Sequence, residues 1–311
     1  MSYFSAKNMV LPLPLSAQGP QVSRLVAGVM KWGEWGHDYA PAAVLDLIEH
    51  CLDLGITTFD HADIYGHYST EALFGEALKL KPELRERMIL VSKCGINLIH
   101  PRRPELKLKS YDTSMGHILR SVDQSLKNLG TDYLDLLLVH RPSPLMHPDE
   151  VSETFHKLQR DGKVRFFGVS NFTPAQFTML GSRIPLVTNQ VEASLLHLDP
   201  FVDGTFDQML QHQLVPMVWS PLGGGQLFAD NPSPRVVRIR ETATEIGARH
   251  GNYGIDQVML AWLLRHPSRI VPVLGTGNKS RLTDAARAVD LKLTNEEWFE
   301  LYEASRGEEV A

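Results

Sequence analysis

The chain has 311 residues, of which 43% are hydrophobic and 22% charged, as is typical of a globular protein with a large core. The formal net charge of −5 argues against a non-specific nucleic-acid binder, and no apolar run approaches the length of a membrane span. We expect a cytoplasmic protein, because the N-terminus shows no secretory signal and the two cysteines, Cys51 and Cys94, form no disulfide framework.

Short apolar runs alternate with longer helical patterns from about residue 25 onward. The runs are apolar almost throughout, which predicts strands of a parallel sheet buried on both faces. Eight strands are predicted, at residues 25–30, 56–60, 88–92, 134–139, 164–170, 186–190, 215–220 and 270–275. Eight such units predict an α/β fold, a closed (β/α)8 TIM barrel, with its active site in the loops that follow the strands.

Two extensions flank this pattern. Residues 1–21 are interrupted by proline and glycine, and we expect this N-terminal extension to cover the barrel bottom, with a hairpin as one form it would take. Thr294 with Glu297 forms a capping pattern that predicts a C-terminal helix. Residues 111–113 are predicted to open the helix at 118–129. No repeat or linker is evident, so residues 1–311 are predicted to form a single domain.

Four ionisable side chains close or follow successive predicted strands. Asp60 and Tyr65 follow the second strand, Lys93 the third and His140 the fourth. Reduction of a carbonyl by hydride leaves charge on the oxygen, and Tyr65 is predicted to donate the proton that this oxygen needs. We expect the ammonium of Lys93 to lower the pKa of the phenol, Asp60 to hold Lys93 and His140 to orient the carbonyl.

Each of these four residues would also fit a purely structural role. Taken singly, Tyr65 would be a packed aromatic and Lys93 a lysine that reaches to solvent. Asp60 would cap a loop, and His140 would bond a backbone carbonyl. The joint occurrence of the four favours a catalytic role. His61, Asp63 and His67 suggest a metal site, and a metal-dependent hydrolase would use His61, Asp63 and His140. We predict no metal, because further His or carboxylate ligands at later strand ends are missing.

The second half of the chain has features of a cofactor site. Ser170, Asn171 and Gln190 end two strands with groups that suit an amide such as nicotinamide. Trp219 would stack on a ring, and the glycine-rich loop 220–225 would cradle pyrophosphate, although a plain flexible loop accounts for those glycines equally. Residues 273–281 lead a strand into a helix N-terminus, which favours anions.

Taken in this order, the motifs resemble those of the aldo-keto reductases. The resemblance extends from residue 25 to about residue 298. The chain is similar in particular to the bacterial oxidoreductase branch related to the potassium-channel β subunits. Its carriers are residues 55–66, 91–95, 134–142 and 162–172, extended by 189–192 and 219–225.

The resemblance implies a (β/α)8 barrel that binds NADP(H) across its mouth and reduces aldehydes or ketones. It implies a catalytic tetrad of Tyr65, Asp60, Lys93 and His140. A small-molecule carbonyl compound is the expected partner, the chain is expected to be a monomer, and weak oligomerisation is left open. The residues assigned to the cofactor are Gly28, Met30, Ser170, Asn171, Gln190, Trp219, Ser220, Pro221, Leu222, Gly224, Gly275, Thr276, Gly277, Lys279, Arg281 and Asp284.

The adenosine end departs from the family pattern. Arg281, Asp284 and Ala285 stand where relatives often carry glutamine, glutamate and asparagine. A guanidinium pairs well with phosphate, so Arg281 with Lys279 predicts NADPH over NADH. The substrate pocket is assigned to Trp32, Tyr65 and His140, with Trp35 as a further aromatic wall. The alternative function is that of a slow NADP(H)-binding regulatory subunit, whose cofactor state signals to a partner.

Overall fold

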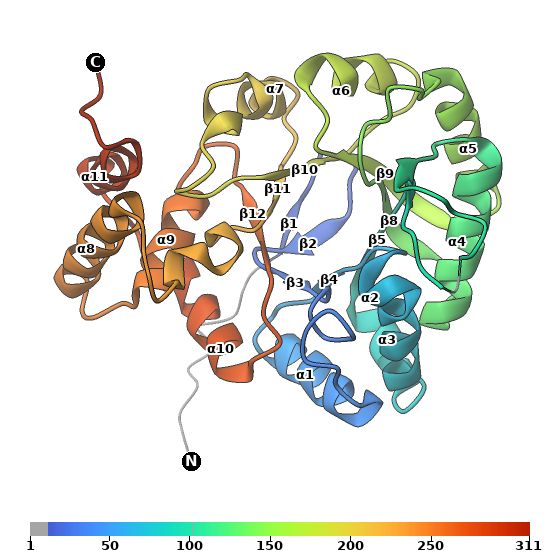
Figure 1. Cartoon of the computed structure of the whole chain (residues 1–311), viewed down its shortest axis with the longest axis horizontal. Coiled ribbons are helices and arrows are strands. Elements are labelled where there is room, and N and C mark those ends of the chain that lie inside the picture. Colours follow the sequence, from blue (N-terminus) through green and yellow to red (C-terminus); the bar gives the residue numbers. More distant parts are fainter. Residues whose placement is uncertain (1–11, 102) are drawn as a thin grey trace.

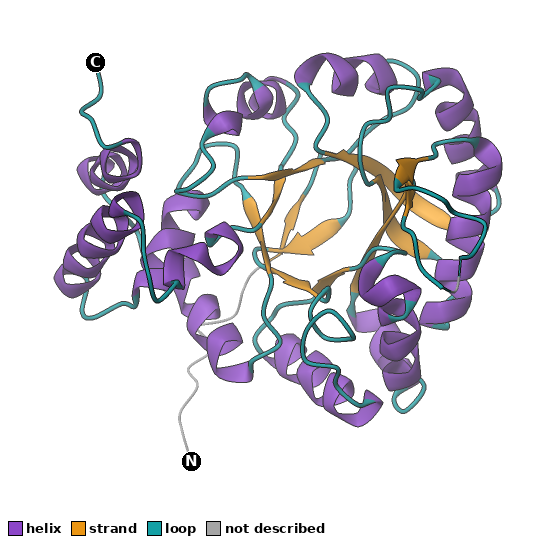
Figure 2. Ribbon diagram, viewed as in Figure 1, coloured by secondary structure: helices purple, strands orange, loops and turns teal. Residues whose placement is uncertain are grey.

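The computed structural model describes residues 12–101 and 103–311. Eight parallel strands close into a barrel, and helices surround it (Figure 1; Figure 2). The strand order around the barrel is β10-β11-β12-β3-β4-β5-β8-β9, so the predicted (β/α)8 barrel is confirmed. The barrel strands are β3 (Val26–Gly28), β4 (Thr58–Asp60), β5 (Ile89–Cys94), β8 (Leu134–Val139), β9 (Val164–Ser170), β10 (Asn189–Glu192), β11 (Met217–Trp219) and β12 (Val271–Leu274).

The strands differ from the prediction mainly at their ends. β8 and β9 have the predicted bounds, whereas β4 begins at Thr58 rather than at residue 56. The reason is that the amide of Ile56 donates to the carbonyl of Cys51, so this residue completes the turn that follows the helix before it. β10 begins at Asn189, three residues after the predicted start at 186.

Ten α-helices longer than one turn are present in residues 12–101 and 103–311. They are α1 (Pro41–Asp53), α3 (Thr70–Leu78), α4 (Met115–Leu129), α5 (Pro148–Arg160), α6 (Pro174–Gly181), α7 (Thr205–Gln211), α8 (Pro234–Arg249), α9 (Ile255–Leu264), α10 (Lys279–Arg287) and α11 (Asn295–Arg306). A single turn, α2 (Tyr65–Tyr68), follows β4. In the described part of the chain, no helix is both long and apolar enough to cross a membrane.

The predicted opening of α4 at residues 111–113 is wrong. Ser114 is the N-cap, and its side chain accepts a hydrogen bond from the amide of His117. Part of the predicted opening is instead a strand, because β7 (Ser110–Tyr111) pairs with β6 (Ile96–Asn97) in an antiparallel ribbon after β5. The helix stops as predicted at Gly130, whose φ of 65° lies in the left-handed region that glycine adopts without strain.

The two extensions lie where they were predicted. β1 (Pro12–Pro14) and β2 (Gln21–Ser23) form a hairpin, and Val215, just before β11, donates to the carbonyl of Leu15. The hairpin therefore closes the end of the barrel where the strands begin, although residues 1–11 of the predicted extension lie outside the described residues. α11 begins with the predicted capping box of Thr294 and Glu297 and packs beside α8, outside the ring of helices (Figure 1).

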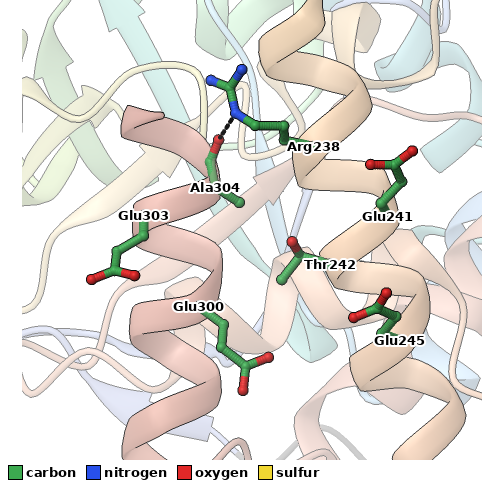
Figure 3. A pocket seen from close by; sticks show the side chains of 7 residues that line it. All are labelled: Arg238, Glu241, Thr242, Glu245, Glu300, Glu303 and Ala304. Carbon is green, nitrogen blue, oxygen red and sulfur yellow. Dashed lines mark hydrogen bonds between the residues drawn. The ribbon is translucent and has the colours of Figure 1, made fainter. Parts of the chain in front are cut away.

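A groove runs between α8 and α11 (Figure 3). Its lining is mostly acidic, and the guanidinium of Arg238 on one side donates to the carbonyl of Ala304 on the other. The four carboxylates are those of Glu241, Glu245, Glu300 and Glu303. This groove is formed by helices outside the barrel, so it is separate from the strand ends that carry the predicted chemistry.

Candidate active site

Three of the four predicted catalytic residues meet around one ammonium group. Lys93, in β5, donates from Nζ to Asp60 Oδ2 at 2.6 Å, to the carbonyl of His61 at 2.8 Å and to the Tyr65 hydroxyl at 3.0 Å. The side chains of Lys93 and Asp60 are 1% and 3% exposed. They meet because β4 and β5 are neighbours in the barrel and both end at its mouth.

His140 joins these residues through the ring of Tyr65. It directly follows β8, and its ring meets that of Tyr65 edge to face, with centroids 6.1 Å apart. Nδ1 of His140 is buried and has no hydrogen-bond partner in the described part of the chain. The structure thus brings the four residues of the predicted tetrad into one cluster.

The environment of the cluster sets its protonation. Burial raises the pKa of Tyr65 and outweighs the opposing effect of Lys93, so the expected net lowering is wrong. Burial lowers the pKa of Lys93, but Asp60 and Tyr65 together outweigh it and the net pKa is raised. Burial, with the charges of Lys93 and Arg141, holds the pKa of His140 well below its ordinary value. Near neutral pH the cluster therefore holds a protonated phenol, an ammonium ion and a neutral imidazole.

Gln190 contacts the cluster directly. It was assigned to the cofactor, but its Nε2 donates to Asp60 Oδ1 at 2.8 Å from β10. Asp60 is thus held by Lys93 at one oxygen and by Gln190 at the other. The sequence does not reveal this supporting role, because the contact crosses the barrel between residues 130 positions apart.

The predicted nicotinamide residues form a connected polar chain beside the cluster. The Ser170 hydroxyl donates to the carbonyl of Gln190, and Asn171 Nδ2 donates to the Ser170 hydroxyl, both at 2.8 Å. Trp219 Nε1 donates to Asn171 Oδ1 at 3.1 Å. Arg141, which sequence analysis also missed, lies 5.5 Å from the Trp219 ring and 3.4 Å from the Ser170 hydroxyl. Strands β9, β10 and β11 thus place an amide, a hydroxyl and an indole side by side.

The loop after β11 has the backbone geometry of a tight turn. Ser220, Gly223, Gly224 and Gly225 all have positive φ. A Cβ on Gly225 would meet nothing within 4 Å, so this side of the loop is open. The amides of Gly223 and Gly225 donate within the loop, so phosphate binding there would depend on its other groups, including the Ser220 hydroxyl. Pro221 and Leu222 belong to the same turn.

Of the two cations predicted in the segment after β12, one is exposed and free of the ion pair that holds the other. Asn278 caps α10, and Arg281 in its first turn is exposed. Lys279 instead pairs with Asp46 on α1.

The glycines of this segment differ in accessibility. Gly275 is open, whereas Gly277 packs on Trp32 and Tyr39. Several backbone carbonyls of the predicted set are already hydrogen-bonded: that of Thr276 accepts from Trp32, that of Gly277 from Tyr39, that of Lys279 from Thr283 and that of Asp284 from Gln257.

The two predicted cofactor residues of the first strand differ in accessibility. Gly28 lies against β12, where a Cβ would come within 2.8 Å of the Leu274 carbonyl oxygen, so this glycine allows the strands to approach. Met30 is 37% exposed just beyond the end of β3.

Comparison with known proteins identifies the family. The model of the Aldo/keto reductase family matches residues 24–306. The chain belongs to this family. Oxidoreductase YdhF of Escherichia coli (strain K12) is 48% identical over 97% of this chain and 100% of its own length. A 6-dehydroglucose reductase of Agrobacterium fabrum is 44% identical over 94% of this chain and 97% of its own.

A solved structure supports the same assignment. The crystal structure of the thermostable aldo-keto reductase Tm1743 with the inhibitor epalrestat has a TM-score of 0.78 and 30% identity. It covers 94% of this chain, which in turn covers 99% of that structure. This aldo-keto reductase is therefore an oxidoreductase with the barrel of its family.

The assignment of Trp32 to the substrate pocket of this aldo-keto reductase is wrong. The Trp32 side chain is 1% exposed and packs against Phe59 and Phe74, so it supports the wall of the barrel rather than a substrate. Trp35 contacts the ring of Tyr65, with centroids 6.1 Å apart, and is the better candidate for an aromatic pocket wall.

The residues of the alternative metal site point to different partners. His61 is fully buried against Phe74, and Asp63 accepts a hydrogen bond from Ser121. Among the described residues, His61, Asp63 and His140 do not form a cluster of metal ligands. The proposed metal-dependent hydrolase thus lacks its site in this part of the chain.

Proposed function

We propose that the chain reduces aldehydes or ketones with NADPH and that Tyr65 donates the proton. The arrangement of Lys93, within hydrogen-bonding distance of both Asp60 and the Tyr65 hydroxyl, is the observation that carries the proposal. Bound NADPH would supply the hydride. The chain must then protonate the carbonyl oxygen and stabilise the phenolate left behind.

Each residue of the cluster has a distinct part in this step. The raised pKa of Tyr65, set first by burial, keeps its proton available at neutral pH. Lys93, 3.0 Å from the hydroxyl, would stabilise the phenolate as the proton leaves. The neutral imidazole of His140 would donate a hydrogen bond to the carbonyl oxygen and orient it. Asp60, held by Gln190, would keep Lys93 in place.

The residues at the mouth fit a nicotinamide dinucleotide. Ser170 and Asn171 offer a hydroxyl and an amide for the carboxamide, and the Trp219 indole offers a face for the ring. The exposed Arg281 would pair with the 2′-phosphate, while Lys279 would share its charge with Asp46. We therefore propose NADPH rather than NADH. The cytoplasmic location and the monomeric state stay predictions.

Oxidised sugars belong in the first substrate panel, because one relative with 44% identity is named for reducing a dehydroglucose. Simple aliphatic and aromatic aldehydes complete the panel. An NADPH-binding protein that reduces none of these compounds would favour the regulatory-subunit alternative over the enzyme.

The deciding experiment compares Tyr65→Phe with wild type. We expect carbonyl reduction to fall by roughly 10²–10⁴-fold, because the ring stays while the acid is lost. NADPH binding, followed by tryptophan fluorescence, should be nearly unchanged. Tyr133→Phe is the matched control, because the Tyr133 ring stacks with Arg85 and Arg165 away from this cluster. A Tyr65→Phe enzyme with near-wild-type kcat would overturn the proposal.

The cofactor preference has its own test. Arg281→Ala should weaken NADPH binding by about tenfold or more while leaving NADH binding unchanged, because only NADPH carries the 2′-phosphate. Arg287→Ala, in the last turn of the same helix, is the matched control. Equal effects of Arg281→Ala on both nucleotides would remove the argument for NADPH.

A further inference from the structure

Three metal-type ligands lie together beside the catalytic cluster, and we call them the rim cluster: Glu34, His67 and His100. They come from three different loops, namely the β3–α1 loop, the turn α2 after β4, and the segment between β6 and β7. Their ligand atoms all lie within 4.8 Å of one another. In the described part of the chain, this is the only group of three His, Cys or acidic side chains with such spacing.

The contacts of the rim cluster already hold the side chains face to face. Glu34 Oε1 lies 2.9 Å from His67 Nδ1. The rings of His67 and His100 stack, with centroids 4.7 Å apart and planes inclined by 16°. The indole Nε1 of Trp35 lies 3.2 Å from each ring nitrogen of His67, so the indole contacts that ring from a third side. Glu34 is exposed and both histidines are partly exposed, so an ion can reach them from solvent.

We propose that Glu34, His67 and His100 bind a divalent transition-metal ion of the Zn²⁺ type, with water completing its coordination. Two imidazoles and one carboxylate are a common ligand set for zinc, at distances of roughly 2.0–2.2 Å. Ligand atoms around a tetrahedral ion of that size lie about 3.4 Å apart, so no pair in the cluster must close by more than about 1.4 Å. The Glu34–His67 pair, now 2.9 Å apart, must open to admit the ion, and side-chain rotation at a partly exposed site allows both changes.

Such an ion would join three loops that surround the catalytic mouth. Trp35 connects the two sites directly, because its ring lies 5.3 Å from that of His67 and 6.1 Å from that of Tyr65. Metal binding should therefore fix the position of this pocket wall and change KM for carbonyl substrates. The binding itself does not depend on the proposed reductase activity, so it is measured separately from turnover.

Isothermal titration calorimetry of chelator-treated full-length protein with ZnCl₂ tests the proposal. We expect one equivalent to bind, and His67→Asn, His100→Ala and Glu34→Gln each to weaken binding by at least tenfold. Asparagine is chosen at position 67 because His67 has a φ of 52°, a conformation that asparagine tolerates well. Cys51 and Cys94 are buried, so thiol binding in the folded protein does not compete.

His147→Ala is the matched control, because His147 is an exposed histidine 4.0 Å from a carboxylate oxygen of Asp149 and should leave the affinity unchanged. If a variant misfolds, an NMR titration of the wild type, which follows the histidine ring signals, takes the place of the measurement on that variant. One equivalent of Zn²⁺ should shift the signals of His67 and His100 but not that of His147. Absence of stoichiometric binding, affinity unchanged in the three variants, or signals that shift elsewhere would each overturn the proposal.

Discussion

Replacing Lys93 with methionine is expected to destabilise the protein as well as to stop its chemistry. At an effective dielectric constant of about 20, charges separated by the 2.6 Å between Lys93 Nζ and Asp60 Oδ2 attract by roughly 6 kcal/mol. Removing two ions from water costs several kcal/mol each, which offsets most of this attraction, so the intact pair adds little net stability. Without Lys93, however, Asp60 remains buried with the single amide of Gln190, and we expect a loss of about 3–5 kcal/mol.

Urea denaturation of four proteins measures this effect: wild type, Lys93→Met, Asp60→Asn and the double variant. The double variant removes both charges, so we expect it to be more stable than Lys93→Met by about 1–3 kcal/mol. A free energy of unfolding for Lys93→Met within about 1 kcal/mol of wild type would refute the reasoning, because it would mean that the buried carboxylate needs no counter-charge. The m-values must agree among the four proteins for the comparison to hold.

Two further predictions concern pH and packing. Because burial raises the pKa of Tyr65 and the phenol must keep its proton to donate it, kcat/KM for reduction should hold through neutral pH and fall only in alkaline solution. A pH profile with a Tyr65-dependent decline centred below roughly 10, the ordinary pKa of tyrosine, would contradict this. Gly75→Ala should cost about 1–3 kcal/mol in urea denaturation, because its Cβ would lie 1.9 Å from the carbonyl oxygen of Asn128 where α3 meets α4. Gly181→Ala is the control, since its Cβ would meet no atom closer than 3.9 Å, and equal losses in the two variants would reject the packing argument.

The barrel could be predicted because its strands are buried on both faces and so differ from the amphipathic helices between them. The agreement is closest for β8 and β9, whose bounds match the prediction. These two strands pair with each other along almost their whole length, so their ends are set by many contacts rather than by one. Element ends that depend on a single contact could not be predicted. The amide of Ile56 turns back to Cys51, and Ser114 rather than the preceding residues caps α4.

The placement of the tetrad could be predicted once the barrel was, because the carboxyl ends of its parallel strands converge at one mouth. The pKa of Tyr65 could not, since its sign depends on a sum of burial against the charges of Lys93 and Asp60. The role of Gln190 was equally out of reach, because the sequence shows a polar strand end but not which oxygen across the barrel it faces.

The histidines and the aspartate after β4 show most clearly why neighbours in the sequence mislead a search for metal ligands. His61, Asp63 and His67 lie close along the chain, yet their side chains take three directions: into the core against Phe74, toward Ser121 of α4, and out to Glu34. His67 has a left-handed backbone conformation, and its side chain contacts Glu34 of the β3–α1 loop. In this fold, ligands are brought together by adjacent βα loops rather than by adjacent residues. A search for metal sites in such sequences should therefore compare the residues that follow neighbouring strands, which here unites Glu34, His67 and His100.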